Sequence, residues 1–290
     1  MRKRVNRKPK PGVYEDVPYE VYDSWPYVNS SSLKHAVRSA GHYRHAMDNA
    51  KSLETPQLRL GHLVHAVASD DLASVVIFQG PEWEAMKVKY QRPTTTREWE
   101  HRVGKLRSKH PGREIYTHDE WLVAEAIHQA IMADTVAAEY LRDARRELSI
   151  VWDCPATRIR CKARLDAVSV DGIVDIKTTY DAAVFERAIL QYHYHRQLAF
   201  YQWGWAMATD GELRPARIIA VESEPFHGVK AAPLSDRLLS VGREEYEVAL
   251  ERISRALKHD RWDGYASPAE WDCRLTEETT IWIDGKETAW

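Results

Sequence analysis

Residues 158–178, RIRCKARLDAVSVDGIVDIKT, contain the pattern that decides the fold. Before residue 171, apolar side chains alternate with charged ones, as in a strand that buries one face. Asp171-Gly172 is a strong signal for a two-residue turn. The apolar segment that follows the turn predicts a second strand, so the sequence predicts a β-hairpin.

The expected register of this hairpin brings three charged side chains to one face. With the turn at residues 171–172, Asp166 lies opposite Lys177. Asp175 shares the face of Lys177, because side chains alternate along a strand, and it is a diagonal neighbour of Asp166. Two close carboxylates repel each other unless a cation lies between them, and Mg²⁺ prefers such oxygen ligands. A lysine beside a metal-bound water fits phosphodiester hydrolysis. The alternative is a solvated hairpin face with one weak Asp–Lys pair.

The rest of the chain predicts a helical first half and an α/β second half. Helices are expected over 29–50 (with a break at Gly41), 57–69, 119–147, 182–208 and 235–259. Further strands are expected over 148–154, 216–223 and 229–234.

Composition is typical of a soluble globular protein, with 44% hydrophobic and 29% charged residues in 290. The net charge of −2 means that a nucleic-acid partner would need locally concentrated positive charge. Eleven Trp and fourteen Tyr suit half-buried surfaces, subunit contacts or base stacking, or reflect a compositional habit. Three cysteines fit a reducing compartment and exclude a disulfide framework or a four-cysteine cluster site. Because no apolar run approaches the roughly 18 residues of a membrane span, we expect a cytoplasmic protein without a membrane partner.

Two segments concentrate positive charge. Residues 1–12 carry six Lys or Arg and no acid, which predicts a flexible basic arm over 1–13. Residues 86–115 are polar without clear periodicity, and 92–113 contain seven Lys or Arg against two acids. Each segment could contact phosphates, and each could equally be a solvated tail or linker.

At this point the hairpin resembles the PD-(D/E)xK nuclease superfamily. Asp166 and the later Asp175-Ile176-Lys177 stand as its D…(D/E)-x-K signature, with Leu165 in place of the motif's proline. The resemblance implies a restriction-endonuclease-like core, in which helices flank a central mixed sheet, preceded by a helical N-terminal half.

The helix after the hairpin resembles one branch of that superfamily. Gln197 and Tyr201 share a helix face and look like the Q-x-x-x-Y motif of RecB-type nucleases. The longer run QYHYHRQLAFYQW resembles RecE-type (exodeoxyribonuclease VIII-like) exonucleases. The resemblance extends over residues 14–266, so we expect one nuclease domain there (helical part 29–147, catalytic core 148–259) and a tail over 267–290.

The resemblance also implies a metal ligand outside the hairpin. Gly61 and His65 form a Gly-x-x-x-His pattern like that of a RecB-type helix whose histidine binds metal. A glycine there lets the helix approach another backbone closely, and neutral imidazole can complete a carboxylate site. The implied ligands are His65, Asp166, Asp175 and the backbone carbonyl of Ile176.

The remaining site residues are expectations from the same resemblance. Lys177 orients the attacking water, while Gln197 and Tyr201 position the DNA strand or the surroundings of the lysine. Glu147 is expected near the active site, although it could also end a solvated helix. DNA contacts are expected from Arg2, Lys3, Arg4, Ser30, Ser32, Arg164, His193 and Tyr194.

The implied activity is a Mg²⁺-dependent exonuclease (with Mn²⁺ as a substitute) that digests linear double-stranded DNA 5′→3′ in recombination or repair. The implied assembly is a homo-oligomeric ring, a trimer or tetramer, in the cytoplasm of a bacterial or phage-infected cell. A single-strand annealing protein is an expected partner, and an iron–sulfur cluster is not expected. The alternatives are an endonuclease or structure-specific nuclease on this fold, a catalytically inactive DNA-binding relative, and a metal-free α/β binding module.

Overall fold

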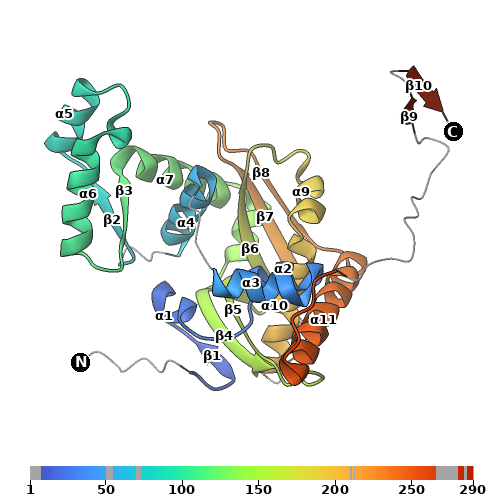
Figure 1. The fold of residues 1–290 in the computed structure, drawn as a ribbon. Helices are drawn as coiled ribbons and strands as arrows, with labels where there is room; N and C mark the ends of the chain where they lie inside the picture. The colour runs from blue at the N-terminus through green and yellow to red at the C-terminus, as the bar shows by residue number, and fades with distance from the viewer. Residues whose placement is uncertain are drawn as a thin grey trace.

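A six-stranded mixed sheet forms the centre of the protein, in the order β1-β4-β5-β6-β7-β8 (Figure 1). The computed structural model describes residues 8–49, 55–69, 73–209, 211 and 213–265, and the backbone of β9 (Thr280–Ile283) and β10 (Lys286–Ala289). Strands β6 and β7 run parallel, and the other neighbours in the central sheet run antiparallel. Its strands are β1 (Gly12–Tyr14), β4 (Arg145–Asp153), β5 (Arg160–Ser169), β6 (Gly172–Thr179), β7 (Ala216–Glu222) and β8 (Val229–Pro233).

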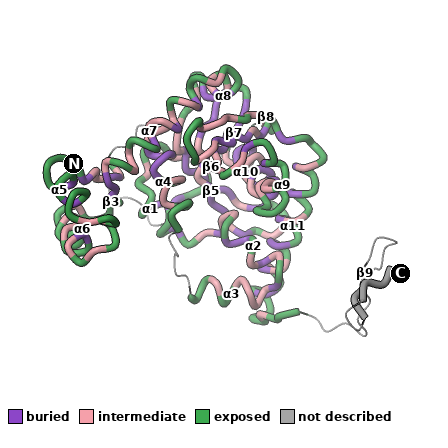
Figure 2. The backbone as a smooth tube through the Cα atoms, turned by 90° about the horizontal axis from the view of Figure 1, so that it is seen from above, coloured by how far each residue is buried: buried purple, intermediate pink, exposed green. Residues whose placement is uncertain are grey.

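Helices cover both faces of this sheet, because its central strands are apolar on both sides. One core joins the sheet to α2 (Ser30–Arg38), α10 (Tyr194–Thr209) and α11 (Asp236–His259). The core on the opposite face joins it to α4 (Pro56–Ala68), α7 (His118–Ala133) and α8 (Thr135–Leu141). The buried backbone is concentrated in these layers (Figure 2). The expected α/β fold with a helix-flanked mixed sheet is therefore confirmed.

Several expected helices are divided by local backbone features. The 29–50 segment breaks at Ser39, which caps α3 (Ala40–Asp48), and not at Gly41. Asp134 caps α8, and the chain enters β4 at Arg145, so the expected helix over 119–147 is wrong at its end. The expected helix over 182–208 is two helices, α9 (Phe185–Gln191) and α10, separated by His193 with φ of 57°.

The basic 86–115 segment is folded, which corrects its interpretation as a linker or mobile segment. It belongs to a small module of β2 (Val75–Phe78), α5 (Pro81–Lys89), the 3-10 helix η1 (Pro93–Thr95), α6 (Arg97–Lys109) and β3 (Glu114–Thr117). Parallel pairing of β2 with β3 closes the module, and Trp83, Met86 and Trp99 lie in a core of its own. Both views place α5 and α6 to one side of the central body (Figures 1 and 2).

Two further elements were not expected from the sequence. Gly12 and Val13, assigned to the basic arm, belong to the edge strand β1, which pairs with β4. Helix α1 (Tyr19–Asp23) lies beside β5, where the buried Lys162 donates to the carbonyls of Tyr22 and Asp23, each at 2.8 Å. None of the helices in the described ranges is long and apolar enough to cross a membrane.

The predicted hairpin is present, but its register is wrong by two residues. Val168 pairs with Ile173 and Ser169 with Gly172, so the turn is Val170-Asp171. Gly172 is already in β6, where a Cβ would lie 2.8 Å from the Pro215 carbonyl oxygen. Glycine is needed there for a close approach of the backbone, not for the turn. Asp166 therefore does not lie opposite Lys177.

Candidate metal centre and catalytic site

The candidate site lies where β5 and β6 separate. Their ladder ends at the pair Ala167–Val174, after which β5 continues beside β4 and β6 beside β7. Beyond that pair, Asp166 Oδ2 accepts a hydrogen bond from the backbone N–H of Ile176 at 2.7 Å. The carboxylate thus takes the place of a ladder acceptor and is fixed at the opening between the strands.

The β4–β5 ladder is interrupted at the same level. Arg146 pairs with Ala167 and Leu148 with Leu165, whereas Glu147 and Asp166 between them do not pair. Glu147 has φ of 51°, a backbone conformation that costs a non-glycine residue roughly 1–3 kcal/mol and is often found at functional sites. Glu147 is therefore a β4 residue next to Asp166, which corrects the alternative that it ends a solvated helix.

Three ligand atoms converge at this interruption. His65 Nδ1, from α4, lies 3.5 Å from Asp166 Oδ1 and 3.7 Å from Glu147 Oε1. All three ligand atoms lie within 4.8 Å of one another, close enough to share one metal ion. Arg164 Nε contacts the second oxygen of Glu147 at 2.5 Å, which fixes that carboxylate. The expected close approach at Gly61 is absent, because a Cβ there would meet only Thr178 Oγ1, at 3.7 Å.

Asp175 and Lys177 form the second half of the site. Asp175 is 1% exposed, and its Oδ2 lies 2.5 Å from Lys177 Nζ. Gln197 Nε2 contacts Asp175 Oδ1 at 3.3 Å and Tyr201 Oη at 2.9 Å. Lys177 Nζ also lies 5.0 Å from the centre of the Tyr194 ring. One face of α10 therefore holds the carboxylate and covers the lysine.

The electrostatics of the site follow from burying several charges together. Burial raises the pKa of Asp166 to about 7, and the charge of Asp175 adds to this. Burial alone would lower the pKa of His65, but Asp166 and Glu147 together raise it to about 9. Burial likewise opposes protonation of Lys177, but Asp175 and Asp166 leave its pKa raised. The buried carboxylates thus favour positive charge nearby, and they strengthen proton binding by His65 and Lys177.

A divalent cation fits this arrangement. The buried Asp175 Oδ2 atom has Lys177 Nζ as its partner, at 2.5 Å. Carboxylate oxygens with one imidazole nitrogen are a suitable donor set for Mg²⁺ or Mn²⁺. His65, Glu147 and Asp166 offer ligand atoms close enough together to hold it.

Several of the expected DNA contacts are occupied elsewhere. Ser30 is the first residue of α2. Ser32 is buried and forms a capping box with Asn29, the residue that precedes the helix. Arg164 is largely buried between Glu147 and the Val17 carbonyl. His193 is partly exposed and Tyr194 covers Lys177. Arg2, Lys3 and Arg4 lie outside the described residues.

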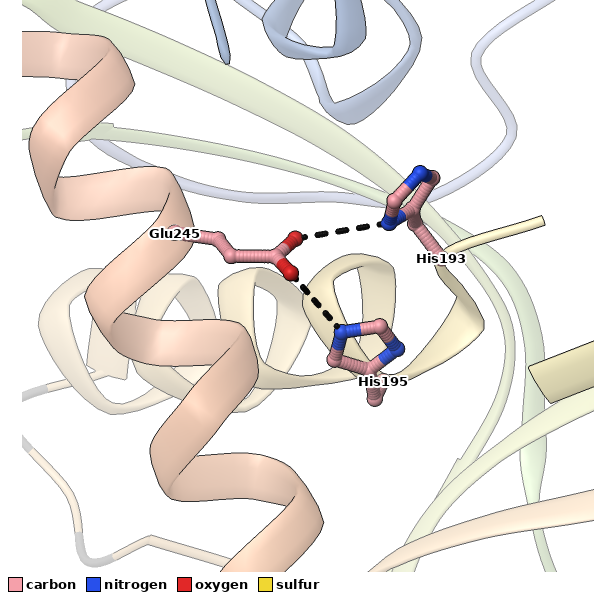
Figure 3. Close-up of side chains that lie close together, drawn as sticks. All are labelled: His193, His195 and Glu245. Atoms are coloured by element: carbon pink, nitrogen blue, oxygen red, sulfur yellow. Dashed lines mark hydrogen bonds and ion pairs between the residues drawn. The ribbon is translucent and has the colours of Figure 1, made fainter. Parts of the chain in front are cut away.

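A contact between α10 and α11 fixes the start of the helix that carries Gln197 and Tyr201, and no sequence motif predicts this contact. Glu245 of α11 contacts His195 Nε2 at 3.2 Å and His193 Nδ1 at 3.5 Å (Figure 3). It also contacts Arg196 Nη1 at 3.0 Å. These histidines and Glu245 are spaced closely enough for a metal ion, but the Arg196 guanidinium already supplies the positive charge there. Gly242, one turn earlier, allows the approach, since a Cβ would lie 2.4 Å from the His195 carbonyl oxygen. The clear sequence signal is this glycine inside a long helix, where it costs about 1 kcal/mol.

A solved structure shares this fold. A putative exonuclease from Eubacterium rectale superposes with a TM-score of 0.56 at 16% identity, covering 81% of this chain and 82% of that one. The match to a phage-related exonuclease from Haemophilus somnus 129PT covers 81% of this chain and 96% of that one, at 13% identity. Its TM-score of 0.31 is too low to establish a shared fold. No curated protein matches the sequence. The family described as PDDEXK-like domain of unknown function (DUF3799) matches residues 29–276, so this chain belongs to that family.

Proposed function

We propose that this protein is a metal-dependent nuclease that hydrolyses phosphodiester bonds of DNA. The observation that carries the proposal is the meeting of two groups where β5 and β6 separate. His65, Glu147 and Asp166 lie on one side, and Asp175 and Lys177 flank Ile176, the β6 residue whose backbone N–H donates to Asp166. Membership of a PDDEXK-like family and a fold shared with a putative exonuclease support this assignment.

Each protein group has a role that follows from its contacts. His65, Glu147, Asp166 and Asp175, with the carbonyl of Ile176, would hold Mg²⁺ or Mn²⁺. Such a cation polarises a phosphoryl group and lowers the pKa of a bound water. Lys177, kept charged by Asp175, orients the attacking water and stabilises developing negative charge.

Helix α10 contributes by positioning Asp175 and Lys177. Gln197 fixes one oxygen of Asp175 and is itself fixed by Tyr201. Tyr194 lies against the lysine, and we propose that its ring contacts the DNA strand there. His193, Ser30, and Arg2, Lys3 and Arg4 of the N-terminal arm remain proposed DNA contacts. For Ser32 and Arg164 we propose an indirect role, since the Ser32 hydroxyl accepts from the Asn29 backbone N–H and the Arg164 side chain contacts Glu147.

The finer assignment is a RecE-type exonuclease that digests linear double-stranded DNA 5′→3′ in recombination or repair. The Q-x-x-x-Y pair on α10 supports the RecB-like branch, and the sequence resemblance supports the RecE type. A ring of three or four subunits in the cytoplasm and an annealing-protein partner are further proposals. The mass of the protein in solution tests the ring, and a monomer would count against it.

Digestion of matched linear and closed circular duplexes, in Mg²⁺ and in EDTA, tests the function. An exonuclease removes the linear substrate alone, and only in Mg²⁺. Cutting of the circle would assign an endonuclease to the same site. Folded protein that cuts neither substrate in Mg²⁺ or Mn²⁺ would contradict nuclease activity.

A further inference from the structure

A line of basic side chains follows one face of α6, far along the chain from the catalytic hairpin. Arg97, His101, Lys105 and Lys109 recur at intervals of four residues, and all four are exposed. Four-residue spacing places successive side chains on one helix face. The residues therefore form one continuous stripe, which we call the α6 stripe.

The α6 stripe is not required by the packing of its own helix. Trp99 and Val103 turn to the opposite side, into the core of the module. Lys105 and Lys109 are four residues apart, and like charges at this spacing repel each other and destabilise a helix. Within the described chain, Arg97, Lys105 and Lys109 form no ion pair, although Arg102 of the same helix pairs with Glu82 and Glu98. A line of uncompensated cations is favourable when it faces a polyanion.

The module that carries the α6 stripe is attached beside the candidate metal centre. Its strand β3 begins at Glu114, whose carboxylate lies 3.6 Å from His62 Nδ1 on α4. His62 precedes His65 by three residues, which is about one helical turn. The module, α6 included, lies to one side of the central body (Figures 1 and 2). The α6 stripe is therefore carried by a module that contacts the helix of the candidate metal ligand His65.

We propose that the α6 stripe binds the phosphate backbone of duplex DNA outside the catalytic site. This inference rests on the proposed function, because it takes the same DNA as its ligand. Over twelve residues a helix rises about 18 Å, and one DNA strand advances roughly 3.4 Å per nucleotide. The α6 stripe therefore spans about five nucleotides of one strand, enough for several phosphate contacts that carry no sequence preference.

The salt dependence of DNA binding tests this surface without requiring cleavage. The experiment measures binding of a fluorescent duplex at several NaCl concentrations, in EDTA, with full-length protein carrying Asp175→Asn. Each lost phosphate contact reduces the slope of log K against log [NaCl] by about 0.9. Replacing Arg97, Lys105 and Lys109 with Gln is expected to reduce the slope by about 2 to 3 and to weaken binding at low salt.

The matched control replaces three other exposed cations that form no ion pair within the described residues, Lys34, Arg237 and Lys258, with Gln. This variant removes the same net charge and is expected to keep the slope of the parent. Equal slopes for the parent and the α6 variant, or equal reductions of the slope in the α6 and control variants, would overturn the proposal that the α6 stripe binds DNA. A melting temperature of the α6 variant at or above that of the parent shows that the fold is intact; single substitutions, each reducing the slope by about one, replace the triple variant if it melts lower.

The two proposals fail separately. Wild-type protein that digests DNA while the α6 variant keeps the parental slope contradicts the α6 stripe and leaves the nuclease assignment standing. Protein that binds DNA with a slope sensitive to α6 but cuts nothing in Mg²⁺ or Mn²⁺ supports the α6 stripe and contradicts the nuclease assignment.

Discussion

Asp166 Oδ2 accepts a hydrogen bond of 2.7 Å from the backbone N–H of Ile176, across the point where two central strands separate. The same carboxylate presents its other oxygen to His65 at 3.5 Å. One side chain therefore closes the end of a β-ladder and contributes to the candidate metal centre. Its structural and chemical roles can be separated by substitution.

We predict that Asp166→Asn and Asp166→Ala lose metal-dependent activity alike but differ in stability. Asparagine can still accept from the Ile176 N–H, whereas alanine leaves this buried donor without its partner, at a cost of roughly 1–3 kcal/mol. Thermal melts in EDTA compare the two. A lower melting temperature for the alanine variant supports the dual role; equal melting temperatures would argue against the structural half of it.

Lys177→Met is expected to lower kcat on linear duplex by roughly 10²–10⁴-fold, the range for a group that assists proton transfer and charge development. Lys162→Met is the matched control, because Lys162 is also a buried lysine on an adjoining strand. Lys162 holds the end of α1, so its loss should lower the melting temperature and leave kcat within a few-fold. Similar kcat values for both variants would remove the assigned role of Lys177.

The stability of metal-free protein is expected to fall as pH rises from about 6.5 to 9. The pKa of His65 is raised to about 9 in the folded state by Asp166 and Glu147, which outweigh burial, and is about 6.5 in an unfolded chain. The stabilisation from protonated His65 is therefore complete below pH 6.5 and is lost as pH passes 9. Melting curves in EDTA measure this loss. In His65→Gln the loss should be smaller, and an unchanged pH dependence would contradict the raised pKa.

Gly242→Ala is expected to lower both stability and activity. Its Cβ would lie 2.4 Å from the His195 carbonyl oxygen, so the first turn of α10 must move. That turn carries Tyr194, which covers Lys177, and leads directly to Gln197. Gly104→Ala in α6 is the control, since a Cβ there meets nothing within 4 Å and alanine should stabilise the helix by about 0.5–1 kcal/mol. Full activity in Gly242→Ala would show that α11 does not position the site.

The sequence predicts which residues share the charged face of the site, because side chains along a strand alternate between its two faces. The predicted register is wrong by two residues, yet a shift of two keeps every side chain on its face. Asp166, Asp175 and Lys177 are therefore close together even though Asp166 is not opposite Lys177. Asp171-Gly172 predicts a turn at these two residues, whereas Gly172 lies in β6 and permits the close approach of the Pro215 carbonyl.

Other features depend on contacts that local pattern does not contain. The charges of α6 obscure its short apolar face of Trp99, Val103 and Leu106, so the sequence pattern alone does not predict the helix. The left-handed backbone of Glu147 has no local signal, since neither glycine nor asparagine stands there. Glu245 meets His195 from fifty residues away, a contact set by the packing of α11 on α10.

The most direct test of the central claim compares wild type with Asp175→Asn in the digestion of end-labelled linear duplex in Mg²⁺. The substitution keeps the shape of the side chain and removes the charge that holds Lys177 and would hold the metal. With equal melting curves, we predict Mg²⁺-dependent release of nucleotides by wild type and a loss of at least about 10²-fold in the variant. Comparable digestion by both proteins would contradict the account.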